Sequence, residues 1–263
     1  MVRARVGFIA TLILLATGSA FSKKAPKISS EELRQITDRG RALYAYDQAA
    51  WYATDAVLAT NPKQGEDGRY IVQKTDAGFT VAFGHLNEGR DAFLIAHIAT
   101  QGKTPQVFSV ERFETARKDT GFYFAAAKAI DLALKDFQPE KATYNIAVLP
   151  APENNLYVYL YPTATEDGVY LVGGDERYTV SSDGNTLIEK HRMHHSIVPF
   201  DTHSAPQGTT LSAGVHGHVL SEVPEDTDVF YVLTRKPSLP EFIGVDGKIL
   251  YQIQTDGTIQ PSK

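Results

Sequence analysis

The chain has 263 residues, of which 43% are hydrophobic, with 13 Tyr, 13 Phe and no Cys. This composition is typical of a β-rich globular protein and excludes a disordered or fibrous chain. A chain of this length can hold its fold through a hydrophobic core without disulfides. The formal charge of −5 argues against nucleic acid as a partner, because nucleic-acid-binding proteins carry basic patches.

Residues 1–20 have the pattern of a secretory signal peptide. A basic start is followed by an apolar run over residues 6–16 and by small residues at 18–20, where a peptidase would cut. The sequence therefore predicts an exported protein, periplasmic or secreted, whose mature chain begins at or close to Phe21. The apolar run is shorter than the ~20 residues of a membrane span, so none is expected after removal of the signal. An uncleaved anchor is the alternative.

A flexible lead-in over residues 21–28 precedes the first predicted helix. Ser29 and Glu32 have the spacing of a capping box, and Asn61–Pro62 would end the helix. Apolar residues recur at steps of three and four, namely Leu33, Ile36, Leu43, Ala50, Trp51, Thr54, Val57 and Leu58. Because Trp51 lies on this stripe, we expect it to be a core anchor, with Trp51→Ala costing ~3–5 kcal/mol of stability.

The aromatic residues around Trp51 allow two interpretations. Tyr44, Tyr46 and Tyr52 lie within seven residues of Trp51 in the sequence. Tyrosine side chains combine a large apolar ring with a polar hydroxyl. We expect them to pack in the core and at its rim. The alternative is that they line a groove for a ligand.

From residue 68 the hydrophobic period changes to two. Four strands are predicted over residues 69–73, 78–83, 92–98 and 106–110, separated by turn sequences, as an antiparallel meander on the first helix. A second helix follows over residues 121–137, and Pro139 ends it.

The second half of the chain is predicted to be rich in strands. They cover residues 143–149, 156–161, 177–180, 186–190, a His-Gly-His strand, 229–233, 241–244 and 248–253. The Asp183–Gly184 and Asp246–Gly247 pairs are hairpin signals. The sequence thus predicts an α+β fold of two closely packed halves, 29–117 and 118–263, each a helix followed by a mainly antiparallel sheet.

Six histidines lie between Glu189 and Asp228, namely His191, His194, His195, His203, His216 and His218. Neutral imidazole is the commonest protein ligand for zinc and similar metals. On a strand, side chains two residues apart share one face, so His216 and His218 can bind the same ion. Asp228, in the acidic turn that follows, completes a set of two histidines and one carboxylate. The alternative is an exposed polar sheet edge without a metal.

The order of His216, His218 and Asp228 resembles the ligand motif of the JAB/JAMM metallopeptidases. That motif has two histidines one residue apart, usually a proline next, then a serine and an aspartate, with a glutamate on an earlier strand. This chain departs from it at Val219 and Glu225, where proline and serine are usual, and its spacing to the aspartate is one residue shorter. A strand is also expected after Asp228, where the family has a helix.

The resemblance covers about thirteen residues and implies a metal that acts as a Lewis acid, lowers the pKa of a bound water, and works with a glutamate as general base. Glu189 is our candidate for that base, because its strand also leads to the histidines at 191–195. Glu176 and Glu153 are alternatives, and each of the three can instead be a solvated strand residue.

The histidines that follow Glu189 on the predicted strand provide a candidate for a fourth ligand. Strand alternation places His194 on the opposite face from His191 and His195. All three therefore cannot face one metal unless the strand bulges. His194 or His195 can still be a supplementary ligand, or a donor that positions one.

The mature chain also resembles a set of uncharacterised exported bacterial proteins, in the blocks Tyr46–Trp51, Gly173–Arg177, Met193–His194 and Asp226–Tyr231. This resemblance implies export and no known activity. We therefore predict an exported metal-binding protein, with His194, His216, His218 and Asp228 as zinc ligands. As an enzyme it would hydrolyse peptide-like bonds in the cell envelope with Glu189 as the base. The alternative is a non-catalytic envelope protein that holds no metal and binds a peptide or protein partner.

Overall fold

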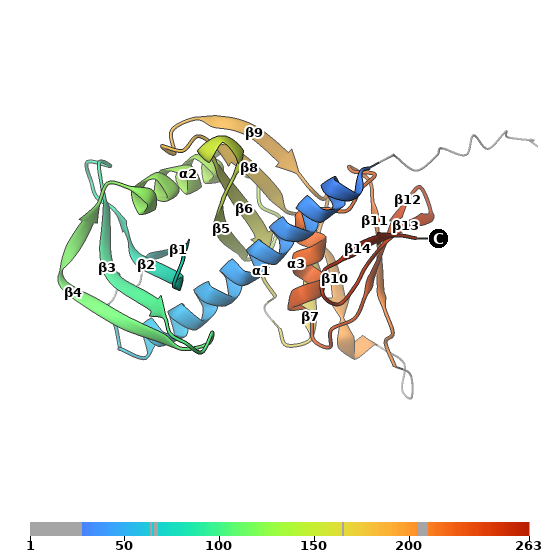
Figure 1. Cartoon of the computed structure of the whole chain (residues 1–263), viewed down its shortest axis with the longest axis horizontal. Helices are drawn as coiled ribbons and strands as arrows, with labels where there is room; N and C mark the ends of the chain where they lie inside the picture. The colour runs from blue at the N-terminus through green and yellow to red at the C-terminus, as the bar shows by residue number, and fades with distance from the viewer. Residues whose placement is uncertain (1–27, 64, 66–67, 165, 205–209, 263) are drawn as a thin grey trace, which may run out of the picture.

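The computed structural model describes residues 28–63, 65, 68–164, 166–204 and 210–262. The predicted signal peptide and the expected start at Phe21 lie outside these residues. The fold is α+β, as predicted, with three α-helices, three four-stranded sheets and one two-stranded sheet in the described part of the chain (Figure 1). None of the described helices combines the length and the apolar character that a membrane span requires.

Helix α1 (Ser30–Leu58) extends diagonally across the molecule (Figure 1). It begins at the predicted capping box, in which the backbone N–H of Glu32 donates to Ser29 Oγ and the Glu32 carboxylate accepts from the Ser29 N–H. Its first turns, with Leu33 and Ile36, pack in the same core as α3 and the C-terminal sheet. Its later turns pack on the first two sheets. One helix therefore contributes to both halves of the fold.

Trp51 is not the predicted core anchor, because 56% of its surface is exposed. The buried stripe of α1 passes through Leu43, Tyr46, Ala50 and Val57. Trp51 follows Ala50 by one residue, which is about 100° around a helix with 3.6 residues per turn, so it points away from that stripe. Leu58 is exposed for the same reason. The expected large cost of Trp51→Ala is therefore wrong, and the tryptophan is available at the surface.

The predicted meander is confirmed. β1 (Arg69–Thr75), β2 (Gly78–Leu86), β3 (Phe93–Gln101) and β4 (Phe108–Asp119) pair antiparallel in that order. β4 continues through residues 117–119, where the sequence indicated a seam between the halves.

Helix α2 (Phe122–Asp136) lies where a second helix was predicted, and it packs on the first sheet and on a second one. That sheet has the order β5 (Tyr144–Pro150), β6 (Leu156–Pro162), β8 (Glu176–Val180) and β9 (Leu187–Arg192), all antiparallel. The alanine-rich face of α2 allows close packing, and it shares one core with strands of both sheets. The β8–β9 hairpin forms at the predicted turn.

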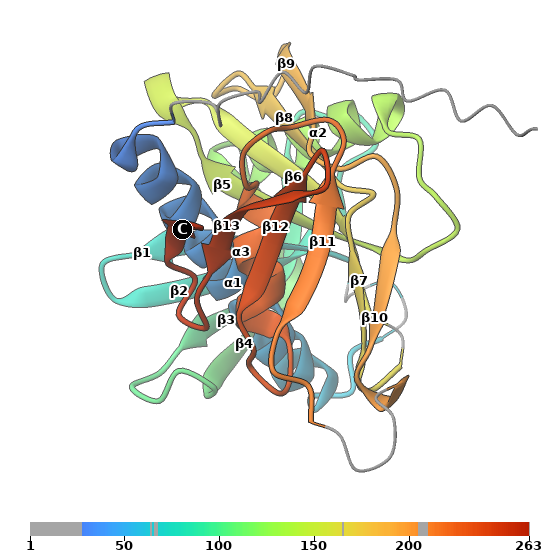
Figure 2. The ribbon, with the colours of Figure 1, turned by 90° about the vertical axis from the view of Figure 1, so that its right-hand side faces the viewer.

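The third sheet carries the histidine pair. Its order is β11 (Gly214–His218), β12 (Glu241–Val245), β13 (Lys248–Ile253) and β14 (Ile259–Pro261), with β11 parallel to β12 and the other pairs antiparallel (Figure 2). β7 (Val169–Val172) and β10 (Val198–Asp201) form the separate two-stranded sheet. The predicted hairpin at Asp246–Gly247 joins β12 to β13.

The strand predicted over residues 229–233 is wrong, because this segment lies in helix α3 (Asp226–Thr234). A capping box starts the helix, since the Glu225 N–H donates to Asp228 Oδ2 over 2.6 Å. The helix connects β11 to β12, and a crossover of this kind is what two parallel neighbouring strands require.

Gly40 marks the place where α3 approaches α1. A Cβ atom at this buried position would lie 2.5 Å from both the Asp226 carbonyl oxygen and Val229 Cβ. Arg39, the preceding residue, forms an ion pair with Asp226 over 2.9 Å. The contact therefore depends on a glycine in α1, which fixes α3 against it.

We expect Gly40→Ala to lower the free energy of unfolding by ~1–3 kcal/mol, the usual cost of overpacking. Helix propensity alone would raise the free energy of unfolding by ~1 kcal/mol. The sign of the measured change therefore shows whether overpacking or helix propensity dominates. Urea denaturation measures it. A variant as stable as the natural protein, or more stable, would contradict the close α1–α3 contact.

Candidate metal centre

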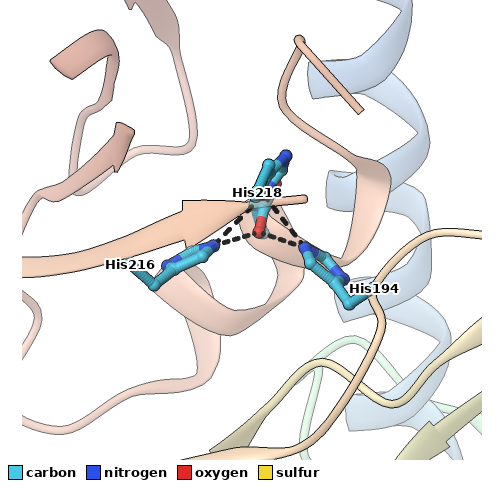
Figure 3. A group of neighbouring side chains, drawn as sticks. His194, His216 and His218 are labelled. Carbon is cyan, nitrogen blue, oxygen red and sulfur yellow. Dashed lines mark hydrogen bonds and ion pairs between the residues drawn. The ribbon is translucent and has the colours of Figure 1, made fainter. Parts of the chain in front are cut away.

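Four side chains from three separate segments converge near the end of β11. His194 follows β9, His216 and His218 lie on β11, and Asp228 lies in the first turn of α3. One ligand atom of each lies within 4.8 Å of those of the others. Figure 3 shows the three imidazoles pointing toward a common point. The convergence that was predicted for His216, His218 and Asp228 is confirmed, and His194 joins them.

The separations between the ligand atoms have the size of a metal coordination sphere. His216 Nε2 lies 2.9 Å and His194 Nε2 lies 3.1 Å from Asp228 Oδ1. His218 Nε2 lies 3.0 Å from His194 Nε2 and 3.3 Å from His216 Nε2. Ligand atoms at ~2.0–2.1 Å from a tetrahedral zinc ion are about 3.3 Å apart. A metal ion therefore fits among these atoms without a large movement.

Each imidazole is oriented by an acceptor on its outer nitrogen. The Nδ1 atom of His194 contacts Asp175 over 2.8 Å, that of His216 contacts Glu241 over 2.9 Å, and that of His218 contacts the Val223 carbonyl over 2.9 Å. These acceptors favour the proton on Nδ1, which leaves the lone pairs of Nε2 directed inward.

This arrangement requires a positive charge at its centre. Three inward lone pairs and one carboxylate repel each other unless a metal ion or protons lie between them. An acceptor on the outer nitrogen of all three imidazoles keeps those lone pairs directed inward.

Asp228 performs two roles through its two oxygens. Oδ2 accepts the hydrogen bond from the Glu225 N–H at the start of α3, and Oδ1 faces His194 and His216. The side chain is fully buried. The cap therefore fixes the rotamer that presents Oδ1 to the centre.

A buried ion pair holds the acceptor of His216 in place. Arg235, which has no exposed surface, donates to Glu241 over 2.7 Å and lies over the rings of Phe200 and Tyr231. Gly214 lies beside the pair, where a Cβ would come within 1.9 Å of Glu241 Oε2. The orientation of His216 thus depends on a packed side-chain network rather than on a solvent-exposed loop.

The charges around the cluster control its protonation. Burial opposes the charged form of His194, but Asp175 and Asp228 outweigh it and hold the pKa of His194 well above its ordinary value. For His216, burial is likewise outweighed by Asp228 and Glu241, which raises its pKa to about 9. Burial also opposes the charge of Asp228, and the neighbouring His218 and His194 reverse the effect and lower its pKa. Protons therefore occupy the centre when no metal is bound.

We expect zinc to stabilise the protein more strongly at higher pH. Because the pKa of His216 rises from 6.5 to about 9 on folding, its protonated form stabilises the zinc-free protein below pH 6.5, and this contribution is lost as the pH rises toward 9. A metal ion needs the unprotonated imidazole, so its affinity increases over the same range. Thermal unfolding with zinc and with a chelator at pH 6, 7 and 8 measures the difference. A zinc-induced shift of the unfolding temperature that stays constant or decreases as the pH rises would contradict this prediction.

The other sequence candidates lie outside this cluster. Glu189 is exposed on β9, where it accepts a hydrogen bond from Thr179, and nothing among the described interactions joins it to the four residues. Glu176 pairs with Lys190, and Glu153 is exposed in a short 3-10 turn. The structure therefore does not support Glu189 as a general base.

The remaining histidines are also separate from the four. His191 contacts Glu225 over 3.0 Å, His195 is exposed, and His203 contacts Asp201 over 3.1 Å. His194 reaches the centre because β9 ends at Arg192, so strand alternation does not apply to it.

A groove of about 780 Å³ lies beside the cluster. His216 and His218 line it together with Ser221, Glu222 and the Asp246–Gly247 turn. Its wall also includes the exposed apolar side chain of Val219. The Nε2 atoms of the two histidines thus face the buried centre. Other parts of the same two residues line the groove.

No family model matches this chain, and the searches of curated proteins and of solved structures also return no match. The resemblances proposed from the sequence therefore remain predictions. The chemistry of the site is argued from its own geometry.

Proposed function

We propose that this is an exported protein that binds one zinc ion through His194, His216, His218 and Asp228. The convergence of three imidazole nitrogens and a buried carboxylate oxygen on one point supports this proposal. The acceptors on all three Nδ1 atoms add to it, since histidine ligands of metals are oriented in this way.

The donor set favours zinc among the common metals. Three nitrogens and one oxygen suit a borderline ion, whereas calcium and magnesium prefer oxygen donors alone. Copper(I) prefers sulfur, and the chain has no cysteine. The separations of 2.9–3.3 Å between neighbouring ligand atoms are close to those in four-coordinate zinc sites.

The centre has the features of a site that holds its metal rather than one that activates water. Structural zinc sites have four protein ligands, while catalytic ones have three and leave a position open for water. All four candidate ligands here lie in the interior, and Asp228 and His218 are almost fully inaccessible. The ion would connect α3, β11 and the segment after β9, which are far apart in the sequence.

A zinc-dependent hydrolase is the second candidate, because the groove beside His216 and His218 gives a substrate access to this region. In that function His194 would leave the metal and a water would take its place. The bound ion would supply Lewis-acid polarisation and a lower pKa for that water. His216, His218 and Asp228 would hold the ion, and Glu222, at the groove wall, would accept the proton in place of Glu189.

Metal analysis of the untagged protein, purified without chelators, tests both functions. We expect about one zinc per chain, and its loss in the double variant His216→Ala with His218→Ala. The double variant His195→Ala with His203→Ala is the matched control, since it removes two histidines outside the cluster. Equal zinc content in both variants would refute the proposed site.

His194→Ala separates the holding function from the catalytic one. If the site is closed, this variant binds zinc more weakly and has no peptidase activity. If His194 is displaced in catalysis, the variant retains zinc with a water as the fourth ligand and cleaves peptide-like substrates at least as fast as the natural protein.

A further inference from the structure

A second hollow, lined by residues of α1 and α3 among others, combines aromatic side chains with a carboxylate. It consists of two adjoining cavities of about 650 and 120 Å³, which share Asp47, Asn145, Thr163, Tyr170 and Thr234 in their walls. One face of α1 forms a side of the larger cavity, with residues at steps of three and four from Tyr44 to Thr54. The smaller cavity extends inward to Asp175, the acceptor of His194.

Asp47 is a partly buried carboxylate in the wall of this hollow. Its Oδ1 atom accepts hydrogen bonds from Tyr161 over 2.9 Å and from Asn145 over 3.3 Å. Among the described residues, no lysine, arginine or histidine forms an ion pair with it. Burial raises the pKa of Asp47, while the hydrogen bonds from Tyr161 and Asn145 oppose that rise. The ionised carboxylate therefore lacks a counter-charge that a bound cation would supply.

The walls of the larger cavity complement a cation. Four aromatic side chains line it, namely Tyr44, Trp51, Tyr70 and Tyr170, and aromatic rings attract cations through their electron-rich faces. Glu166 and Asp167 lie at the same walls as Asp47, against one basic residue, Lys236. Three carboxylates against one ammonium give the hollow a net negative charge.

We propose that this groove binds an alkylammonium group, carried either by a lysine side chain of a peptide or by a free amine. The ammonium would meet the carboxylate of Asp47, and its alkyl chain would lie along the aromatic residues of α1 and β1. This is the chemistry by which proteins recognise such groups, with a carboxylate at the end of an apolar, aromatic-lined slot. The site is separate from the proposed zinc ligands and does not depend on the metal.

The single tryptophan of the chain provides a direct measurement. Trp51 lines the groove, is stacked on Tyr52 with 5.3 Å between ring centroids, and is partly exposed, so its fluorescence reports binding there. The probes are a capped pentapeptide with a central lysine, the same peptide with norleucine in its place, butylammonium and 1-butanol, all at one ionic strength.

We expect a saturable fluorescence change with the lysine peptide at a concentration at least tenfold lower than with the norleucine peptide. If butylammonium also binds more tightly than butanol, a free amine is a sufficient ligand; if only the lysine peptide does, the ligand is a peptide. Equal binding of the charged and neutral members of both pairs would overturn the proposal. The measurement is made with zinc-loaded and zinc-free protein, so a failed zinc site would leave its result unchanged.

Asp47→Asn tests the carboxylate, because asparagine keeps an oxygen that can accept from Tyr161 and Asn145. We expect at least a tenfold loss of affinity for the charged probes only. Asp55→Asn is the matched control, since it removes one negative charge from the exposed part of α1 and should leave binding unchanged. Unchanged binding in Asp47→Asn would refute the site.

Tyr44→Leu is a second variant that tests the aromatic wall if Asp47→Asn does not fold. It removes one ring from the groove and retains a shorter apolar side chain. We expect a severalfold loss of affinity for the lysine peptide and no change for the norleucine peptide. Equal losses for both peptides would indicate a merely apolar slot and overturn the proposal.

Discussion

Zinc is expected to raise the thermal unfolding midpoint of the metal-free protein by about 10 °C when its free concentration is about a thousand times the dissociation constant. Binding to the folded state alone then contributes ~4 kcal/mol, and each kcal/mol shifts the midpoint of a chain of this size by ~2–4 °C. The physical reason is that the ion cancels the repulsion between three imidazole lone pairs and the Asp228 carboxylate. Calorimetry with and without zinc measures the shift.

Asp228→Asn should abolish most of this shift. Asparagine can still accept the hydrogen bond from the Glu225 N–H, so the start of α3 is preserved while the charged ligand is lost. His195→Ala, a change outside the cluster, should keep the full shift. A zinc-dependent rise in Asp228→Asn equal to that of the natural protein would show that Asp228 is not a ligand.

Asp226→Ala is expected to lower the free energy of unfolding by ~3–5 kcal/mol, the usual effect of breaking a buried ion pair. Asp226 has no exposed surface and forms ion pairs with Arg39 and Arg177. It also accepts a hydrogen bond from Tyr159 over 2.9 Å. Its removal leaves the largely buried Arg177 charge and the buried Tyr159 hydroxyl without these contacts. Chemical denaturation measures the loss.

Asp38→Ala is the matched control for this prediction. Asp38 pairs with Arg34 over 2.7 Å on the exposed face of α1, where both side chains are more than half exposed. Solvent screens such a pair, so we expect a cost below ~1 kcal/mol. Similar costs for Asp226→Ala and Asp38→Ala would contradict the role of Asp226 in joining α1, β8 and α3.

Local patterns were sufficient to predict much of the fold and part of the site. The capping box of α1, the meander and the Asp-Gly hairpins are encoded by neighbouring residues, and each forms where the sequence placed it. Strand alternation correctly placed His216 and His218 on one face. Asp228 was identified as the acidic residue of the same segment, although the sequence suggested a turn followed by a strand instead of a helix.

The failures arose where packing outweighed local preference. The segment Val229–Leu233 is short and rich in β-branched and aromatic residues, which do not distinguish a strand from a buried helix. Its helix signal was the spacing of Glu225 and Asp228, and glutamate is not a usual N-cap residue. Trp51 was misplaced because it follows Ala50 by one residue, which turns it about 100° away from the buried stripe of α1.

The contacts that complete the site could not be read from the sequence. Asp175 and Glu241 reach the histidines across separations of 19 and 25 residues, and no local pattern relates them. Glu189 was chosen because it precedes the histidines on one strand, but proximity in sequence did not bring it to the centre. The sequence feature that could have indicated these acceptors was the number of acidic residues in the segments flanking the histidines.

The position of α1 between distant parts of the chain determines when the protein can finish folding. Arg41, near the start of the described chain, donates to the Asp256 carbonyl, 215 residues later, over 3.0 Å. Contacts of such long range form slowly, because the chain between them must be ordered first. Helix α1 can form its last contacts only after β14 has been synthesised. A chain that emerges from its amino end therefore stays incomplete until its final strand has been synthesised.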